Sequence, residues 1–161
     1  MKQFQLQTEV RLARHINDVF AFFAEARNLE DITPAFLKFN VLTPAPIEMA
    51  AGTLIDYRLS LRGVPIRWRT RIDEWDPPVR FVDFQLSGPY RLWRHEHTFT
   101  PVLGGTLCTD RVTYAVPGGP GVERLVECLF VRRDVERIFQ FRRQRLIERF
   151  GLLSESGRAS A

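Results

Sequence analysis

Residues 106–150 read TLCTDRVTYAVPGGPGVERLVECLFVRRDVERIFQFRRQRLIERF, and this stretch decides the fold. Over residues 106–116, apolar and polar side chains alternate, which is typical of a strand with one buried face. A turn rich in proline and glycine follows at 117–121, and apolar residues then recur at helical spacing to about residue 150. The stretch therefore predicts a strand that leads into one long C-terminal helix.

The apolar stripe of this helix changes face near its middle. Val122, Leu125 and Leu129 belong to a first stripe, whose continuation would reach the polar Arg133. Because the later apolar residues lie on a rotated face, we expect a kink or bend near Phe130–Val131.

Most of the chain before this stretch also shows the period of two that is typical of strands. Six further strands are predicted, at residues 4–12, 37–42, 53–61, 66–72, 80–86 and 90–100. Short connections between successive strands favour an antiparallel meander.

Two short helices are expected after the first strand. Residues 19–24 form an apolar run that Asn17 or Asp18 can cap, and residues 28–34 allow another helical turn, which Pro34 ends. The predicted fold is α+β, with a sheet of about seven antiparallel strands and a long C-terminal helix. We expect one domain over residues 1–152 and a flexible tail over 153–161.

Composition excludes several classes of protein. The chain has 161 residues, of which 45% are hydrophobic and 12% aromatic, so it can bury a core and is not intrinsically disordered. No apolar run approaches the roughly 18 residues that a membrane span needs. Cys108 and Cys128 are too few for a disulfide framework, and no signal peptide follows Met1, so we expect a cytoplasmic protein.

The positive charge does not by itself indicate a nucleic-acid-binding protein. The net charge is +4, from 23 basic and 19 acidic residues, and the two signs are interleaved along the C-terminal helix, as on a solvated face. Trp68 points to the strand face opposite Arg67 and Arg69, which is the wrong arrangement for stacking bases beside phosphate contacts. Nucleic acid is not an expected partner. Transient contact with a membrane surface, and a monomeric or homodimeric state, stay open.

Several motifs resemble the SRPBCC superfamily, which includes the START-like lipid-transfer domains and coenzyme Q-binding proteins. HINDVFAFF at 15–23, followed by Asn28-Leu29 and Thr33-Pro34, resembles the opening of these domains. Three further motifs resemble the bacterial polyketide cyclase/dehydrase-like branch: WDPP at 75–78, GPYRLWRHEHTF at 88–99 and DRVTY at 110–114. The resemblance covers roughly residues 3–150. It implies a helix-grip fold, in which a curved sheet wraps around the long helix and encloses an apolar cavity.

His95 and His97 are the residues best placed to carry chemistry. They lie two apart on one strand, on the same face as Trp93 and Phe99, and this face should point inward. Three alternatives are open: a polar anchor for a ligand, a general acid/base pair, or an internal hydrogen-bond network.

A metal site is not expected at these histidines. His-x-His on a strand suits zinc or iron, but a third ligand is needed. No carboxylate follows closely, His15 lies at the first helix, and nothing in the spacing points to Asp110. The sequence predicts neither a metal nor a cofactor.

Arg142 lies on the apolar stripe of the long helix, and its role has alternatives too. Its guanidinium can anchor the carboxylate or phenolate of a ligand, or pair with a buried acidic side chain. Alternatively, its aliphatic part packs in the core while the guanidinium reaches solvent. The expected ligand-binding residues line the cavity or border it: Trp68, Asp83, Gln85, Tyr90, Trp93, His95, His97, Phe99, Asp110, Tyr114, Ile138 and Arg142.

The predicted function is binding of a hydrophobic small molecule, such as a lipid, an isoprenoid or a polycyclic aromatic, by a carrier or sensor without catalytic residues. Many aromatic side chains, including 13 Phe, suit such a cavity. The alternative is a polyketide aromatase/cyclase or dehydratase that uses His95, His97 and Tyr114 as acid/base groups.

Overall fold

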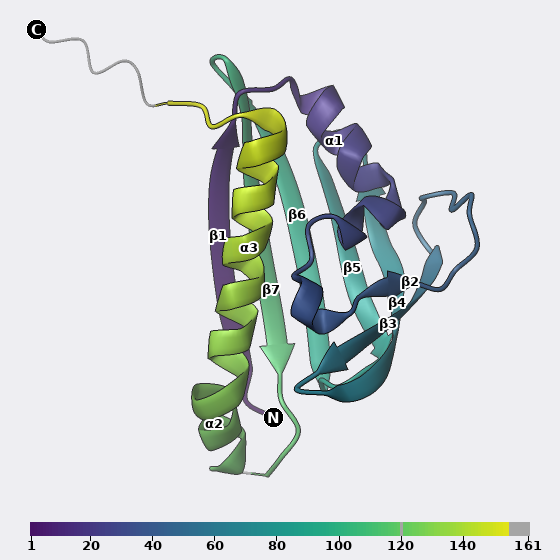
Figure 1. The fold of residues 1–161 in the computed structure, drawn as a ribbon, viewed down its shortest axis with the longest axis vertical. Helices are drawn as coiled ribbons and strands as arrows, with labels where there is room; N and C mark the ends of the chain where they lie inside the picture. Colours follow the sequence, from purple (N-terminus) through teal and green to yellow (C-terminus); the bar gives the residue numbers. More distant parts are fainter. Residues whose placement is uncertain (120, 155–161) are drawn as a thin grey trace, which may run out of the picture.

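The computed structural model describes residues 1–119 and 121–154, which form one seven-stranded antiparallel sheet with helices on one face (Figure 1). The strands are β1 (Phe4–Leu12), β2 (Asn40–Val41), β3 (Leu54–Leu61), β4 (Val64–Asp76), β5 (Arg80–Ser87), β6 (Leu92–Val102) and β7 (Gly105–Ala115). Their order in the sheet is β1-β7-β6-β5-β4-β3-β2. The predicted seven-stranded meander is confirmed, and the first strand extends it at one edge by pairing with the last.

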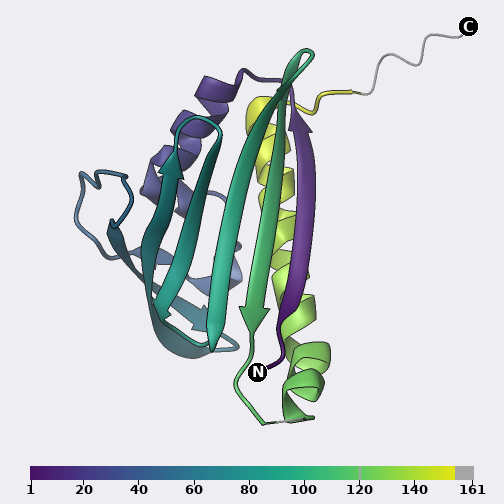
Figure 2. The same ribbon diagram turned by 180° about the vertical axis from the view of Figure 1, so that it is seen from behind.

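Helices cover the concave face in two groups. They are α1 (Ile16–Ala24), the 3-10 turns η1 (Ala26–Glu30) and η2 (Ala35–Leu37), α2 (Val122–Val126), the π-helical η3 (Glu127–Val131) and α3 (Arg132–Phe150). In Figure 1, α3 lies over β1 and β7, while α1 and the two 3-10 turns cover the rest of the same face. Seen from behind, no helix formed by the described residues covers the opposite face of the sheet (Figure 2). This is the expected helix-grip architecture.

Turn chemistry sets the length of the hairpins. Arg62 and Gly63 both have positive φ, at 50° and 82°, which matches the two-residue turns that suit the twist of a hairpin. Val64 pairs with Leu61, so the connection is two residues shorter than the gap at 62–65 between the predicted strands 53–61 and 66–72. The last hairpin likewise turns only at residues 103–104.

The structure corrects three local predictions near the N-terminus. His15, and not Asn17 or Asp18, caps α1, because its Nδ1 accepts a hydrogen bond from the Asn17 amide at 3.3 Å. The turn expected at 28–34 begins earlier, since the Glu25 side chain caps η1, and it ends at Glu30. Pro34 does not end it but directly precedes η2. The strand expected at 37–42 shrinks to β2, because residues up to 37 belong to η2.

The long helix contains a π-helical segment close to the expected irregularity. Residues 127–131 form η3, between α2 and α3. One extra residue in a helix rotates everything that follows by about 100°, which accounts for the change of face in the apolar stripe. Beyond it, α3 buries Val135, Phe139, Arg142 and Leu146 against the sheet. Most of the predicted tail, 155–161, and Pro120 of the predicted turn lie outside the described residues.

Candidate functional site

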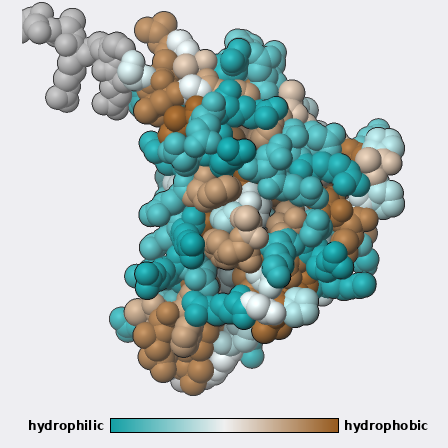
Figure 3. Space-filling model, in the orientation of Figure 1, coloured by the Kyte–Doolittle hydropathy of each residue, from teal (hydrophilic) through white to brown (hydrophobic). Residues whose placement is uncertain are grey.

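A cavity of about 160 Å³ lies between α3, the α1–η2 segment and strands β3 to β6. Its wall is mostly apolar and aromatic, with Ile55 and Tyr57 from β3, Trp68 from β4, Trp93 from β6 and Phe139 from α3. Figure 3 shows the helix-covered face of the molecule, where hydrophobic residues are visible near the middle, between hydrophilic residues on either side. The cavity lies between the curved sheet and the two groups of helices. It exists because neither group of helices covers the whole concave face of the sheet.

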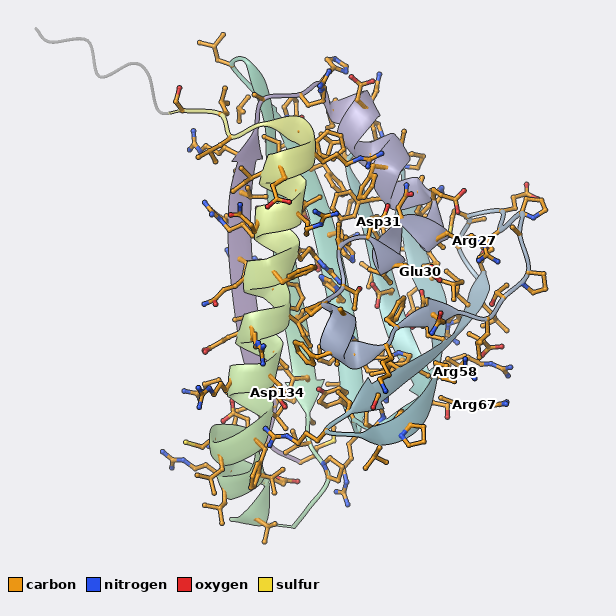
Figure 4. The ribbon with its side chains drawn as sticks, in the orientation of Figure 1. Arg27, Glu30, Asp31, Arg58, Arg67 and Asp134 are labelled. Carbon is orange, nitrogen blue, oxygen red and sulfur yellow. The ribbon has the colours of Figure 1, made fainter. Side chains whose placement is uncertain are left out.

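Eight of the twelve expected ligand-binding residues line this cavity. They are Trp68, Asp83, Tyr90, Trp93, His95, His97, Ile138 and Arg142. The prediction that His95 and His97 face inward is confirmed, since both are buried in the cavity wall. Arg67, next to Trp68 in β4, is exposed and extends outward beside Arg58 (Figure 4), as alternation along the strand predicts.

The other four expected residues lie outside the lining. Phe99 packs in the core beside Phe20, with ring centroids 5.4 Å apart. Gln85 donates a hydrogen bond from Nε2 to the Tyr90 carbonyl at 2.7 Å, which braces the turn after β5. Asp110 lies behind the two histidines, and Tyr114 faces a separate surface hollow.

The Tyr114 hydroxyl is engaged away from the cavity. It donates to Glu127 Oε1 at 3.0 Å, and Arg132 donates to the same carboxylate from Nε at 3.0 Å. Burial, followed by the hydrogen bond to Glu127, raises the pKa of Tyr114. Its contacts make Tyr114 a link between the sheet and the π-helical segment.

Asp83, His95, His97 and Asp110 form a compact group, called here the histidine–aspartate cluster. The sheet register creates it, because Asp83 of β5 pairs with His95, and His97 pairs with Asp110 of β7. On one side, Asp83 Oδ2 lies 3.1 Å from His97 Nε2 and 3.6 Å from His95 Nδ1. On the other, Asp110 Oδ1 lies 2.8 Å from both His95 Nε2 and His97 Nδ1.

Aromatic neighbours hold the two imidazoles in place. The ring centroids of His95 and His97 are 3.7 Å apart, and Phe81 stacks on the other face of His97 at 4.1 Å. Phe139 of α3 meets His95 edge-on at 5.3 Å. Both rings are therefore fixed by packing as well as by the carboxylates.

The pKa values of the two histidines in the cluster shift in opposite directions. Burial, together with the neighbouring His97, lowers the pKa of His95. Burial also opposes ionisation of His97, but the carboxylates of Asp110 and Asp83 outweigh it and raise the pKa of His97. Burial favours the neutral form of Asp110, yet its contacts with both imidazoles hold the pKa of Asp110 well below its usual value.

Two buried polar atoms lack a hydrogen-bond partner within the described part of the chain: His97 Nδ1 and Arg142 Nε. His97 Nδ1 is close to Asp110 but poorly aimed for a hydrogen bond. Arg142 is 8% exposed, and its guanidinium lies 5.0 Å from the centre of the Phe139 ring. Buried polar groups are rarely left unpaired, so an unpaired one in a cavity wall points to a missing partner.

The structure also supplies a candidate third metal ligand. Asp83, His95 and His97 each offer a ligand atom, and these atoms lie within 4.8 Å of one another. The spacing of residues along the chain did not indicate this carboxylate, because it comes from the neighbouring strand.

Tyr57 and Phe139 line the cavity but are not among the ligand-binding residues predicted from the sequence. Tyr57 alternates with Ile55 and Leu59 along β3, so the strand pattern held a signal for it. Burial raises the pKa of Tyr57. Glu127, which is 1% exposed, had no comparable signal, because the π-helical segment turns it inward.

Comparison with protein families agrees with this architecture. Residues 12–141 match the family described as polyketide cyclase / dehydrase and lipid transport. The chain belongs to this family. The match includes the cavity-lining strands and about the first half of α3. No curated protein matches the sequence. Within residues 1–119 and 121–154, no helix of this family member is long and apolar enough to cross a membrane.

Solved structures show the same cyclase/dehydrase-like fold. The Zhui aromatase/cyclase from Streptomyces sp. R1128 has a TM-score of 0.69 at 16% identity, covering 92% of this chain and 93% of that chain. A protein from Thermus thermophilus has a TM-score of 0.63 at 20% identity, covering 91% of this chain and 99% of that chain. The nucleoside-diphosphate sugar epimerase from Corynebacterium glutamicum is 26% identical, with a TM-score of 0.64. The match covers 89% of this chain but 28% of the epimerase, so most of the epimerase has no counterpart here.

Proposed function

We propose that this protein binds a small hydrophobic molecule with an anionic end, placing the apolar body in the cavity and the anionic end at Arg142. The observation that carries the proposal is the unpartnered Arg142 Nε in the wall of a mostly apolar cavity. The family description, which includes lipid transport, supports binding of a hydrophobic molecule.

The cavity volume limits the size of the ligand. An engineered protein cavity of about 150 Å³ binds benzene, so a volume of about 160 Å³ accommodates one ring without rearrangement. A lipid, an isoprenoid or a polycyclic aromatic requires side chains such as Ile138, which is only half-buried, to move aside. The proposed ligand is therefore a compact ring, or a longer molecule that extends out of the cavity.

Two fluorescent probes with one skeleton test the anionic end. 8-Anilinonaphthalene-1-sulfonate carries a sulfonate, and N-phenyl-1-naphthylamine is the same molecule without it. Both are larger than the cavity, so each should bind the native protein saturably with part of its ring system extending out of the cavity. In Arg142→Met, which keeps an apolar side chain of similar length, the affinity for the sulfonate should fall about 10- to 100-fold, since charged hydrogen bonds contribute about 1.5–3 kcal/mol. The affinity for the neutral probe should stay within about twofold.

Arg143→Met is the matched control, because Arg143 is the next residue in α3 and is exposed. It should leave both affinities unchanged. If neither probe binds the native protein, the binding function is wrong. If Arg142→Met weakens both probes equally, a hydrophobic site exists but Arg142 is not its anchor.

A second candidate function is dehydration or cyclisation of a polyketide-like substrate. The contact between His95 Nε2 and Asp110 at 2.8 Å supports it, because a carboxylate that orients an imidazole favours proton transfer. The name of the Zhui aromatase/cyclase, whose fold is similar, points the same way. Tyr114 does not fit this candidate, since its hydroxyl is bonded to Glu127 outside the cavity. Loss of turnover with unchanged probe binding in His97→Gln would favour catalysis over binding alone.

A further inference from the structure

We propose that Asp83, His95 and His97 bind a divalent transition-metal ion, while Asp110 holds the two imidazoles in position from behind. One carboxylate from β5 and two imidazoles from β6 meet on the same wall of the cavity. The proposal goes beyond the binding of a hydrophobic molecule and does not depend on it.

The distances between the donor atoms suit a common ion. Ligand atoms that lie about 2.0–2.2 Å from zinc, at tetrahedral or octahedral angles, are about 3.0–3.5 Å from each other. Asp83 Oδ2 lies 3.1 Å from His97 Nε2 and 3.6 Å from His95 Nδ1. The three ligand atoms are all within 4.8 Å of one another. Small side-chain shifts would bring them into coordination.

The remaining ring nitrogens have the partner that metal-bound histidines usually have. A histidine that binds a metal through one nitrogen commonly donates its other N–H to a carboxylate or carbonyl. Asp110 Oδ1 lies 2.8 Å from His95 Nε2 and 2.8 Å from His97 Nδ1. One carboxylate can therefore orient both ligands. His97 Nδ1, unpartnered in the described structure, needs only a change of angle to donate to it.

Charge also favours a cation between these groups. Asp83 and Asp110 place two carboxylates in the interior, with side chains 18% and 11% exposed. Two like charges in a poorly solvated site repel each other and are costly to bury. A divalent ion supplies two positive charges, which would balance both carboxylates.

The geometry of the wall gives the class of site. Asp83, His95 and His97 line the cavity, whereas Asp110 does not, so the remaining coordination positions face the cavity. Three protein ligands with open positions are typical of catalytic zinc and of non-haem iron(II) with two histidines and one carboxylate. Closed structural zinc sites have four protein ligands instead. The open positions would accept water or the polar end of a molecule in the cavity.

Zinc alone tests the proposal in the untagged full chain. After treatment with a chelator, calorimetric titration with Zn²⁺ should show one ion bound per chain. The chain has three histidines, so their ring signals can be followed individually by NMR during the titration. The signals of His95 and His97 should shift with saturation at one equivalent, and those of His15 should not. This measurement uses the unaltered protein and does not depend on the folding of any variant.

Variants then separate the roles of the two carboxylates. Asp83→Asn should weaken Zn²⁺ binding at least 100-fold, because it removes a charged ligand. Asp110→Asn should weaken it about 10–100-fold, the usual effect of removing a carboxylate that orients a metal-bound histidine. His15→Ala and Cys128→Ser remove the exposed imidazole and the exposed thiol, and should leave the affinity unchanged.

The proposal is wrong if Zn²⁺ leaves the ring signals of His95 and His97 unshifted, or if Asp83→Asn binds Zn²⁺ as tightly as the wild type. Zinc binding without binding of either fluorescent probe would support the metal site and contradict the proposed function. Probe binding without zinc binding would support the proposed function and contradict the metal site.

Discussion

The two walls of the cavity differ in how they are stabilised. The histidine–aspartate cluster on β5, β6 and β7 depends on pairwise contacts between charged or polar groups, each with a specific partner. The opposite wall, around Ile55, Tyr57 and Leu59 of β3, depends on non-directional apolar burial. Loss of one partner from the polar wall leaves a buried charged or polar group unpaired, which lowers the free energy of unfolding strongly. In the apolar wall, the free energy of unfolding falls in proportion to the side-chain volume removed. We therefore expect the polar wall to depend on the identity of each side chain, and the apolar wall to accommodate changes in side-chain or ligand volume.

The largest expected effect is on the polar wall. Asp110→Ala leaves two buried imidazoles without their shared carboxylate, and removal of one partner from a buried ionic group costs about 3–5 kcal/mol. The free energy of unfolding, measured with denaturant in the presence of a chelator, should fall by that amount.

Asp56→Ala is the matched control for this loss, because Asp56 is an exposed carboxylate paired with Arg69 on the surface. It should reduce stability by a small fraction of the effect at Asp110. Equal losses in the two variants would show that the cluster contributes no more than a surface ion pair.

A smaller effect is expected on the apolar wall. Ile55 is 1% exposed and lines the cavity, so Ile55→Ala should cost about 2–4 kcal/mol through lost burial and enlarged space. The same change should strengthen binding of the neutral naphthylamine probe, because it adds volume beside the ligand. Denaturant unfolding and a fluorescence titration measure the two outcomes.

Leu54→Ala serves as the control, since Leu54 precedes Ile55 in β3 but is 46% exposed. It should change stability by less than about 0.5 kcal/mol and leave probe binding unchanged. Weaker probe binding in Ile55→Ala would contradict the view that this wall adapts to its ligand.

The smallest effect is a difference in reactivity that reports opening of the polar wall. Burial, with a contribution from nearby Asp110, raises the pKa of the Cys108 thiol to about 12. At about pH 8 it is almost entirely protonated, and it is also shielded from reagents. A disulfide reagent should therefore label Cys128 promptly and Cys108 only through opening of the fold.

In a Cys128→Ser background, labelling of Cys108 should be slow, and the added change Asp110→Ala should accelerate it more than Ile55→Ala does. Prompt labelling of Cys108 in the otherwise unaltered fold would show that the region around Asp110 opens readily. If Asp110→Ala and Ile55→Ala accelerate the labelling of Cys108 equally, the two walls do not differ in how they respond to the loss of a side chain.

Sequence periodicity determined the main features of the fold. Alternation with a period of two predicted the strands, and alternation alone aimed His95, His97 and Trp93 into the interior. Helical spacing predicted the long C-terminal helix and the change of face near Phe130–Val131. These predictions succeeded because periodicity is a property of neighbours along the chain, and local geometry converts it directly into a buried face.

Features that depend on partners far apart in sequence were decided only by the tertiary structure. Nothing local to His95 indicates that Asp83 pairs with it, because that pairing follows from the register of two strands. Register depends on turn lengths and on packing across the whole sheet, where a slip of one residue would send every side chain to the other face. The same holds for the inward turn of Glu127, which follows from the π-helical segment. The sequence by itself determined which faces are buried, and the assembled sheet decided which buried groups meet.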